Sequence, residues 1–199
     1  ARAINDRIGF TAATSQSVWA DHPEKILGTR RDWVEKNPHT ARALVSAVLE
    51  AARWIEASPE NKRETAQILS RRAWLNCKEQ YLTGRMLGEY DNGLGQRWQD
   101  AHPIRFFNEG AVSYPYLSDG MWFLTQFRRW GLLKAAPDYA GIAQRINQTA
   151  VWQDAATAVG GITTPTSPLR SSTLMDGTVW NGPDPEGYAS RFAIHRKGA

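Results

Sequence analysis

The stretch from Tyr114 to Leu133 reads YPYLSDGMWFLTQFRRWGLL and has the pattern of a loop that leads into a buried helix. Pro115 favours extended geometry in the residue before it, and Ser118 or Asp119 has a side chain able to cap a helix that starts near Gly120. We expect the buried stripe of this helix at helical spacing, on Phe123, Leu124, Phe127 and Trp130. The pair Arg128-Arg129 falls in the last turn, where positive charge suits the helix dipole. The stripe predicts core packing and no chemistry of its own.

The composition is that of one globular domain or of a portion of a larger one. The chain has 199 residues, of which 42% are hydrophobic, enough for a sizeable core. No apolar run approaches the roughly 18 residues that a membrane-spanning helix needs. The N-terminus has no apolar region like that of a signal peptide, and we expect the chain to begin in the middle of a longer protein. The single cysteine, Cys77, excludes an internal disulfide.

The charge balance is mildly basic, with a formal net charge of +4 and a pI near 9.4. The arginines occur as short, separated pairs in RRDW, RRAW and FRRW. This spacing favours solvated helix faces over a nucleic-acid surface, so we expect no direct binding of nucleic acid. A weak positive field would still attract small anions in a salt-dependent way.

Several helices are predicted from caps and apolar spacing. Asn37-Pro38 is a strong helix start, and the helix should run to about Ala57. Its apolar stripe comprises Ala41, Leu44, Val45, Val48, Leu49, Ala52 and Ile55. Ser58-Pro59 starts a second helix, and RAWLNCKEQYL (72–82) predicts a third. Two more are expected at Asp138–Asn147 and at Thr149–Val159, where Gly160 and Gly161 stop the second.

The remaining segments carry little periodicity. Residues 1–30 mix turn formers with short apolar runs. IGFTAATSQSVW predicts a short strand or a loop that leads into a helical turn, and KILG predicts a second short strand. Residues 88–110 predict a long loop with one short strand at Ile104–Phe107. The last part, 160–199, is rich in Pro, Ser, Thr and Gly and predicts an extended wrapping tail with a turn at Asp176-Gly177.

Motifs for metal binding and catalysis are missing from the sequence. The four histidines, His22, His39, His102 and His195, have no paired spacing, and no metal, phosphate-loop or nucleophile motif occurs. The acidic residues Asp91, Asp100 and Glu109 are spaced as solvated loop residues are. We therefore expect no enzyme activity, no cofactor and no metal site.

Hydroxyl and amide groups are concentrated in the segment Gly9–Trp19, GFTAATSQSVW. They belong to Thr11, Thr14, Ser15 and Gln16. Neutral donors and free backbone amides suit a small, weakly hydrated anion. The alternative is an ordinary polar loop or an N-cap for the turn at Ser17–Ala20.

Three motifs resemble one known family. They are YLSD-x-x-WFLTQ-x-RRWG in the opening stretch, GFTA-x-T followed by HPEK and LGTRRDWVEKNP, and the closing MDGTVWNGPDPEGYASRFAI. These motifs are similar to those of the nitrate/nitrite- and bicarbonate-binding proteins, which serve ABC transporters or act as cytoplasmic nitrate sensors. The resemblance covers residues 8–192. It implies an α/β, helix-rich C-terminal portion of a type II periplasmic-binding-protein fold, whose first lobe would precede this chain.

The resemblance also implies candidate site residues. A Val-Thr pair of the family contributes to the anion site, and Ala13-Thr14 occupy the matching positions, where alanine loses packing methyls but no donor. A position on the following helix carries a charge that differs with the ligand. Arg42 is the nearest cation in that region, and its alternative role is that of a solvated surface arginine. The implied ligand-binding set is Thr11, Ala13, Thr14, Ser15, Gln16 and Arg42.

The implied function is non-covalent capture of nitrate or nitrite between two lobes that close about a hinge. Residues 1–30 would form the hinge and cleft segment, 31–159 a helical body and 160–199 the tail. As a transport component the protein would be periplasmic or membrane-associated and would deliver the anion to an ABC permease. The alternative is a cytoplasmic sensor that controls an RNA-binding antiterminator. The sequence does not discriminate nitrate, nitrite and bicarbonate.

Overall fold

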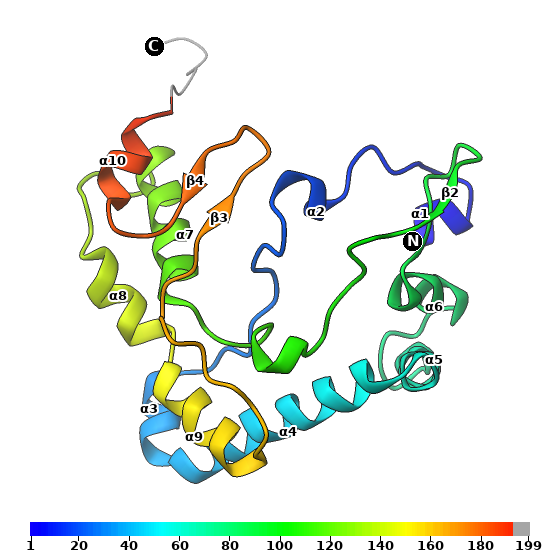
Figure 1. Cartoon of the computed structure of the whole chain (residues 1–199), viewed down its shortest axis with the longest axis horizontal. Coiled ribbons are helices and arrows are strands. Elements are labelled where there is room, and N and C mark those ends of the chain that lie inside the picture. The colour runs from blue at the N-terminus through cyan, green and yellow to red at the C-terminus, as the bar shows by residue number, and fades with distance from the viewer. Residues whose placement is uncertain (193–199) are drawn as a thin grey trace.

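A computed structural model describes residues 1–192 as a helix-rich chain with two small antiparallel sheets of two strands each. The elements are α1 (Arg2–Asn5), α2 (Ser15–Val18), α3 (Arg31–Lys36), α4 (Pro38–Ala57), α5 (Pro59–Ser70), α6 (Gln80–Leu87), β1 (Glu89–Asp91), β2 (Arg97–Gln99), a 3-10 turn η1 (Asn108–Gly110), α7 (Leu117–Arg129), α8 (Tyr139–Ile146), α9 (Thr149–Val159), β3 (Ser172–Thr173), β4 (Val179–Trp180) and α10 (Pro185–Ser190). Figure 1 shows them arranged around an open ring. Helix α4 forms its base, α5, α6 and the β1–β2 hairpin stand at one end, and α7, α8, α10 and the β3–β4 hairpin stand at the other.

Helix α4 confirms the predicted start and end, with Pro38 in the first turn. Its buried residues are Ala41, Leu49 and Ala52, and Leu49 packs with Tyr114 and with Trp152, Ala155 and Ala156 of α9. The predicted stripe is too wide, however, because Leu44 and Val48 are 46% and 44% exposed. Helix α9 covers the Leu49 side of α4 and leaves the neighbouring apolar positions open.

Helix α5 starts at Pro59 as predicted, and the Ser58 side chain caps it by accepting from the Asn61 amide at 3.1 Å. The predicted helix over residues 72–82 is wrong. Residues 71–77 form turns that fold back on the end of α5, where the amides of Leu75 and Cys77 donate to carbonyls of that helix. Asn76 takes a left-handed φ of 46°, which a helix does not tolerate, so α6 begins only at Gln80.

The segment 88–110 is more ordered than predicted. It contains the β1–β2 hairpin, in which Tyr90 pairs with Trp98. The expected strand at Ile104–Phe107 is wrong, because the amides of Phe106 and Phe107 donate to the Glu56 carboxylate instead of to a neighbouring strand. The expected strand at residues 25–28 is also not formed. Of the two alternatives for the segment near residue 10, a strand or a loop that leads into a helical turn, the loop is found, and α2 follows it.

Helix α7 differs from the sequence prediction in its start and in its buried face. It starts at Leu117, three residues before Gly120, so Ser118 and Asp119 lie inside its first turn and do not cap it. Phe123, Phe127 and Trp130 are 42%, 46% and 59% exposed, so the predicted stripe is wrong for these three residues. The buried residues of α7 are Ser118, Asp119, Met121 and Thr125. The tail buries this more polar face by supplying hydrogen-bond partners for it.

The described part of the tail wraps over α7 and contains a helix, α10, that the sequence pattern did not predict. The Arg170 amide donates to Ser118 Oγ at 3.0 Å, Arg170 Nε donates to Asp119 Oδ1 at 2.9 Å, and Trp180 Nε1 donates to the Ser118 carbonyl at 2.9 Å. The turn at Asp176-Gly177 is confirmed and joins β3 to β4. The core at this end comprises Met121, Tyr139, Ala143, Trp180 and Tyr188. Residues 193–199, including His195, lie outside the described part.

Candidate functional site

The Thr11–Thr14 segment spans between the two ends of the ring. At its start, the Thr11 amide donates to the Asn92 carbonyl of the hairpin loop at 2.9 Å. Just beyond its end, Trp19 is buried against Trp122 of α7, with ring centroids 4.6 Å apart, and forms a bridge with Leu174 of the tail. Both attachments are tertiary contacts, so this short irregular segment is held in place without a strand of its own.

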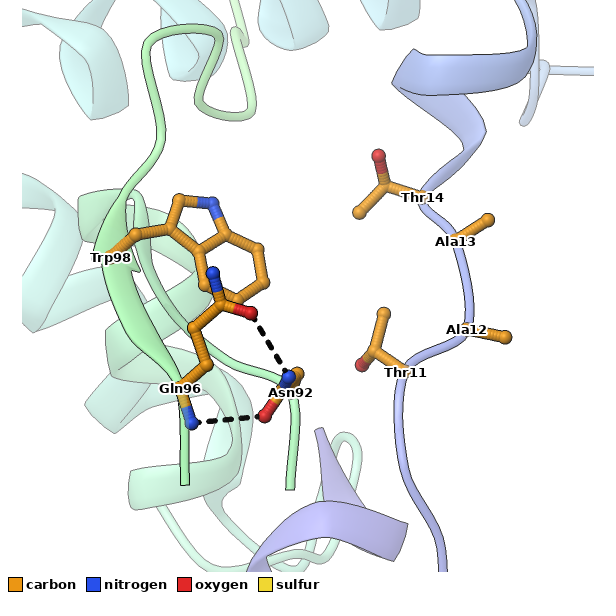
Figure 2. Close-up of a pocket in the computed structure, with 7 residues that line it drawn as sticks. All are labelled: Thr11, Ala12, Ala13, Thr14, Asn92, Gln96 and Trp98. Carbon is orange, nitrogen blue, oxygen red and sulfur yellow. Dashed lines mark hydrogen bonds between the residues drawn. The ribbon is translucent and has the colours of Figure 1, made fainter. Parts of the chain in front are cut away.

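An open hollow of about 450 Å³ lies between this segment and the β1–β2 hairpin. Its lining residues are Thr11, Ala12, Ala13, Thr14, Asn92, Gln96 and Trp98. Figure 2 shows the side chains of Thr11 and Thr14 directed toward the hairpin, whereas the methyl groups of Ala12 and Ala13 point away from it. Thr11 and Thr14 are therefore the predicted residues that present polar side chains to the hollow.

The other predicted residues lie elsewhere. Ser15 and Gln16 belong to α2 and do not line the hollow. Gln16 is engaged with Asp21, whose amide donates to Gln16 Oε1 at 2.9 Å. Thr14 is the N-cap of α2, since its Oγ1 accepts from the Ser17 amide at 3.4 Å, so the alternative capping role holds for this residue as well.

Arg42 lines a different hollow, of about 310 Å³, on the surface of α4 and α9. The residues around it include Ser46, Glu50 and Val159, and none of them is shared with the hollow at Thr11. The structure therefore does not bring Arg42 together with the threonines. Within residues 1–192, no arginine, lysine or histidine lines the hollow at Thr11.

The hairpin residues of the hollow were missed by the sequence prediction. Asn92 organises the loop: its Oδ1 accepts from the amides of Leu94 and Gln96 at 2.8 and 3.2 Å, and its Nδ2 donates to Gln96 Oε1 at 3.3 Å. The signal was present in the sequence, because Asn-Gly, here Asn92-Gly93, is a strong mark of a hairpin turn.

The rim of the hairpin carries an ion pair. Arg97 Nε donates to Asp91 Oδ2 at 2.8 Å. The pKa of Asp91 is lowered, first by the hydrogen bond from the Gly93 amide and then by Arg97. Over the described range, no group of three or more His, Cys, Asp and Glu side chains is placed to hold a metal ion. Nor does that range contain a helix long and apolar enough to cross a membrane.

Comparisons with known proteins identify the relatives of this chain. Residues 1–70 match the model of the NMT1-like family. The nitrate/nitrite binding protein NrtA of Synechocystis is 38% identical over 97% of this chain and 44% of its own length. The bicarbonate-binding protein CmpA of Synechococcus elongatus is 34% identical over 98% of this chain and 46% of its own length. This chain thus spans about half the length of these curated relatives.

A solved structure agrees with the sequence comparison. The crystal structure of the periplasmic nitrate-binding protein NrtA from Synechocystis superposes with a TM-score of 0.89, with 35% identity, over 97% of this chain and 51% of the other. Fold and sequence therefore lead to the same relatives, as the motifs of the sequence predicted. The chain belongs to the family of nitrate/nitrite- and bicarbonate-binding proteins and has part of their periplasmic-binding-protein fold.

Proposed function

We propose that this protein binds nitrate or nitrite without converting it, as the solute-binding component of an ABC-type uptake system. The observation that carries the proposal is the match to nitrate-binding NrtA over 97% of the chain, in both sequence and structure. The transport role is preferred to the sensor role because relatives named as transport components support it. One of them is the nitrate import ATP-binding protein NrtC of Synechocystis, which is 32% identical over 98% of this chain.

The hollow at Thr11 and Thr14 is the part of the binding site that we assign to this chain. Both side chains line it, the Thr11 hydroxyl is directed at the hairpin, and Thr11 has no side-chain hydrogen bond among the described residues. The Thr14 hydroxyl caps α2 at the edge of the hollow. Nitrate and nitrite carry one negative charge spread over several oxygens and accept hydrogen bonds without donating any. Neutral donors in a partly enclosed site can replace the weakly held water of such an anion.

The segment boundaries follow from this assignment. Residues 1–30 form the wall that faces the ligand, 31–159 the body that supports it, and 160–199 the tail, whose described part ties α2 and α7 together. Closure of a second lobe over the hollow would then trap the anion, and the ligand would favour the closed state through contacts that exist only there. Such a component would be periplasmic or membrane-associated and would deliver the anion to a permease.

A calorimetric titration of the protein in its full natural length with nitrate tests the proposal. Thr11→Val and Thr14→Val keep the side-chain shape and remove one donor each, so each should weaken binding by about 1–2 kcal/mol. Thr14→Ser is the matched control, because it keeps both the hydroxyl and the cap of α2. The proposed function would be overturned if nitrate, titrated from micromolar to millimolar concentrations, gives no heat of binding and does not raise the melting temperature of the parent protein. Unchanged affinity in both valine variants would remove these threonines from the site.

Bicarbonate is the second candidate ligand, and the match to CmpA favours it. The two ligands are separated by titrating nitrate into the protein in the presence and absence of bicarbonate at constant pH. If bicarbonate competes with nitrate and binds more tightly, bicarbonate is the ligand. The fold and the location of the hollow would be unchanged.

A further inference from the structure

The three arginine pairs of the sequence have different surroundings in the structure. In RRDW, Arg30 donates to Asp32 from Nε at 2.9 Å and from Nη2 at 3.1 Å. In FRRW, Arg128 Nε donates to Glu186 Oε1 at 3.0 Å. Each of these two pairs therefore contains an arginine whose charge is offset by a carboxylate of the protein itself.

The third pair, in RRAW, has no such partner. Arg71 and Arg72 are exposed in the turn that follows α5, and neither has a carboxylate within 4.0 Å in the described part of the chain. The segment 71–78, RRAWLNCK, contains a third cation, Lys78, and no acidic residue; the next acid along the chain is Glu79. The turn is therefore a local concentration of positive charge.

Two large apolar side chains stand beside these arginines. Trp74 is 64% exposed and Leu75 is 57% exposed, and Trp74 is the most exposed of the tryptophans that the structure describes. Backbone hydrogen bonds fix the turn that carries them: the Trp74 amide donates to the Arg71 carbonyl at 3.0 Å, and the Leu75 amide donates to the Leu69 carbonyl of α5 at 3.0 Å. The exposed pair is thus held in a defined position, so a partner that covers it has little backbone to order.

We propose that this turn, residues 71–78, docks on the surface of a lipid bilayer that contains anionic headgroups. A tryptophan side chain prefers the boundary between headgroups and acyl chains, and arginines beside it are attracted to the negative surface of the bilayer.

The exposed apolar pair favours lipid over an acidic protein as the partner. An acidic protein surface would suit the arginines equally well, but it would need a pocket shaped for two adjacent apolar side chains that project from a turn. A bilayer accepts such side chains without a pocket. The turn lies at the α5–α6 end of the ring (Figure 1) and contributes no residue to the hollow at Thr11, so this inference is independent of nitrate binding.

Co-sedimentation with lipid vesicles tests the proposal. The protein in its full natural length, free of any attached lipid, is mixed with vesicles of phosphatidylcholine alone or of phosphatidylcholine with phosphatidylglycerol. It should bind the anionic vesicles more strongly and should dissociate from them as salt is raised. The double variant Arg71→Gln, Arg72→Gln should lower the partition coefficient roughly ten-fold or more, because each cation near an anionic bilayer contributes about five-fold. Trp74→Ala should lower the partition coefficient several-fold, because the indole is lost from the interface.

Two matched variants separate the turn from charge and exposure in general. The double variant Arg30→Gln, Arg31→Gln removes the same charge from another arginine pair, and Trp130→Ala removes another tryptophan that is 59% exposed. Both should partition as the parent does. Equal losses in these controls and in the variants of the turn, or no binding of the parent to anionic vesicles, would overturn the proposal.

A fluorescence readout covers the case in which a variant folds poorly or in which vesicles bind through another surface. Cys77, the single cysteine of this chain, lies in the turn and can carry an environment-sensitive fluorophore in a protein with no other cysteine. Its emission should shift to shorter wavelength when anionic vesicles are added. Binding without this shift would place the contact elsewhere and contradict the proposal. If the parent does not bind vesicles but binds polyglutamate, and the Arg71→Gln, Arg72→Gln variant binds neither, the turn contacts an acidic protein and the lipid proposal fails.

Discussion

The polar cluster around Glu56 and the hollow between Thr11 and Trp98 are both built from hydrogen-bond donors, and they use them in opposite ways. At Glu56, Oε2 accepts from the amides of Phe106 and Phe107 at 2.7 and 3.0 Å, and Oε1 accepts from the Asn108 amide at 2.9 Å and from Arg105 Nη2 at 2.8 Å. In the hollow, by contrast, no described residue accepts from the side-chain donors of Gln96 and Trp98.

The difference teaches how to separate an anchor from a candidate binding site. The Glu56 cluster closes on a carboxylate that belongs to the protein, whose side chain is only 16% exposed, and it ties the returning segment 105–108 to the end of α4. Burial alone would raise the pKa of Glu56, but the hydrogen bonds from Arg105 and from the three amides outweigh it and lower the pKa to about 2. Donors already occupied stabilise the fold, whereas donors left over are available to a ligand.

The largest effect expected is on the anchor. Glu56→Ala removes the acceptor of three amides and the carboxylate partner of Arg105, so the free energy of unfolding should fall by about 3–5 kcal/mol. Urea denaturation measures it. Thr11→Val, in the open hollow, should change the free energy of unfolding by no more than about 0.5 kcal/mol. Equal losses in the two variants would break the comparison.

The pH dependence of the anchor follows from the lowered pKa. A carboxylate that is more acidic in the folded state contributes stability that is fully present above its unfolded pKa, about 4.3. That contribution, about 3 kcal/mol for a folded pKa of about 2, should be lost as pH falls from the unfolded value through about 2. Stability measured between pH 5 and 2 in the parent and in Glu56→Gln isolates it, because glutamine does not titrate. Parallel curves for the two proteins would contradict the assignment.

Helix α7 extends the comparison to apolar side chains. Met121 is 7% exposed and packs in the core beneath the tail, so Met121→Ala should cost about 2–4 kcal/mol of unfolding free energy. Phe127 is 46% exposed, and Phe127→Ala should cost about 1 kcal/mol or less. Thermal or chemical denaturation of the two variants tests whether the buried face of α7 is the one in the structure or the apolar stripe predicted from the sequence. A greater loss in the Phe127 variant would favour the stripe.

A smaller effect is expected where the two walls of the hollow meet. Gly93 and Gly95 both have positive φ, but a Cβ at Gly93 approaches the Gly9 carbonyl oxygen whereas a Cβ at Gly95 meets nothing within 4 Å. Gly93→Ala should therefore be less stable than Gly95→Ala by about 1 kcal/mol and should bind nitrate more weakly, because the walls are pushed apart. Matched melting curves and titrations measure both. Identical behaviour would mean that the contact between hairpin and segment is loose.

The smallest effect is expected at Arg42. If Arg42 belonged to the site, as the family resemblance implies, Arg42→Glu would abolish nitrate binding by repulsion at close range. Its position in a separate hollow beside Glu50 leads us instead to expect less than about a two-fold change, reduced further by salt. Titrations at low and moderate salt decide it. If the Arg42→Glu variant loses nitrate binding at both salt concentrations, Arg42 belongs to the site.

Where the outcome was local, the sequence predicted the structure. Asn37-Pro38, Ser58-Pro59 and Gly160 start or stop helices through backbone geometry that neighbours along the chain determine, and these boundaries were predicted within a residue or two. The sequence also marked residues 11–16 as rich in side-chain donors, and the family resemblance made Thr11 and Thr14 candidates for the site, which remains a prediction. The hairpin was missed although Asn92-Gly93 marked its turn, because its strands are only three residues long and show no alternation.

What the sequence by itself determined was the family, the helical segments with strong caps and the polar character of residues 11–16. Only the tertiary structure decided which face of α7 is buried, because Ser118 and Asp119 gain partners from a tail some fifty residues away. It also decided that residues 106–108 give their amides to Glu56 and that Trp98, not Arg42, lines the hollow with the threonines. The physical reason is common to all three. The spacing of apolar residues along the chain shows which side chains tend to be buried. A polar side chain or a free amide is placed instead by its hydrogen-bond partner, and that partner is distant in sequence.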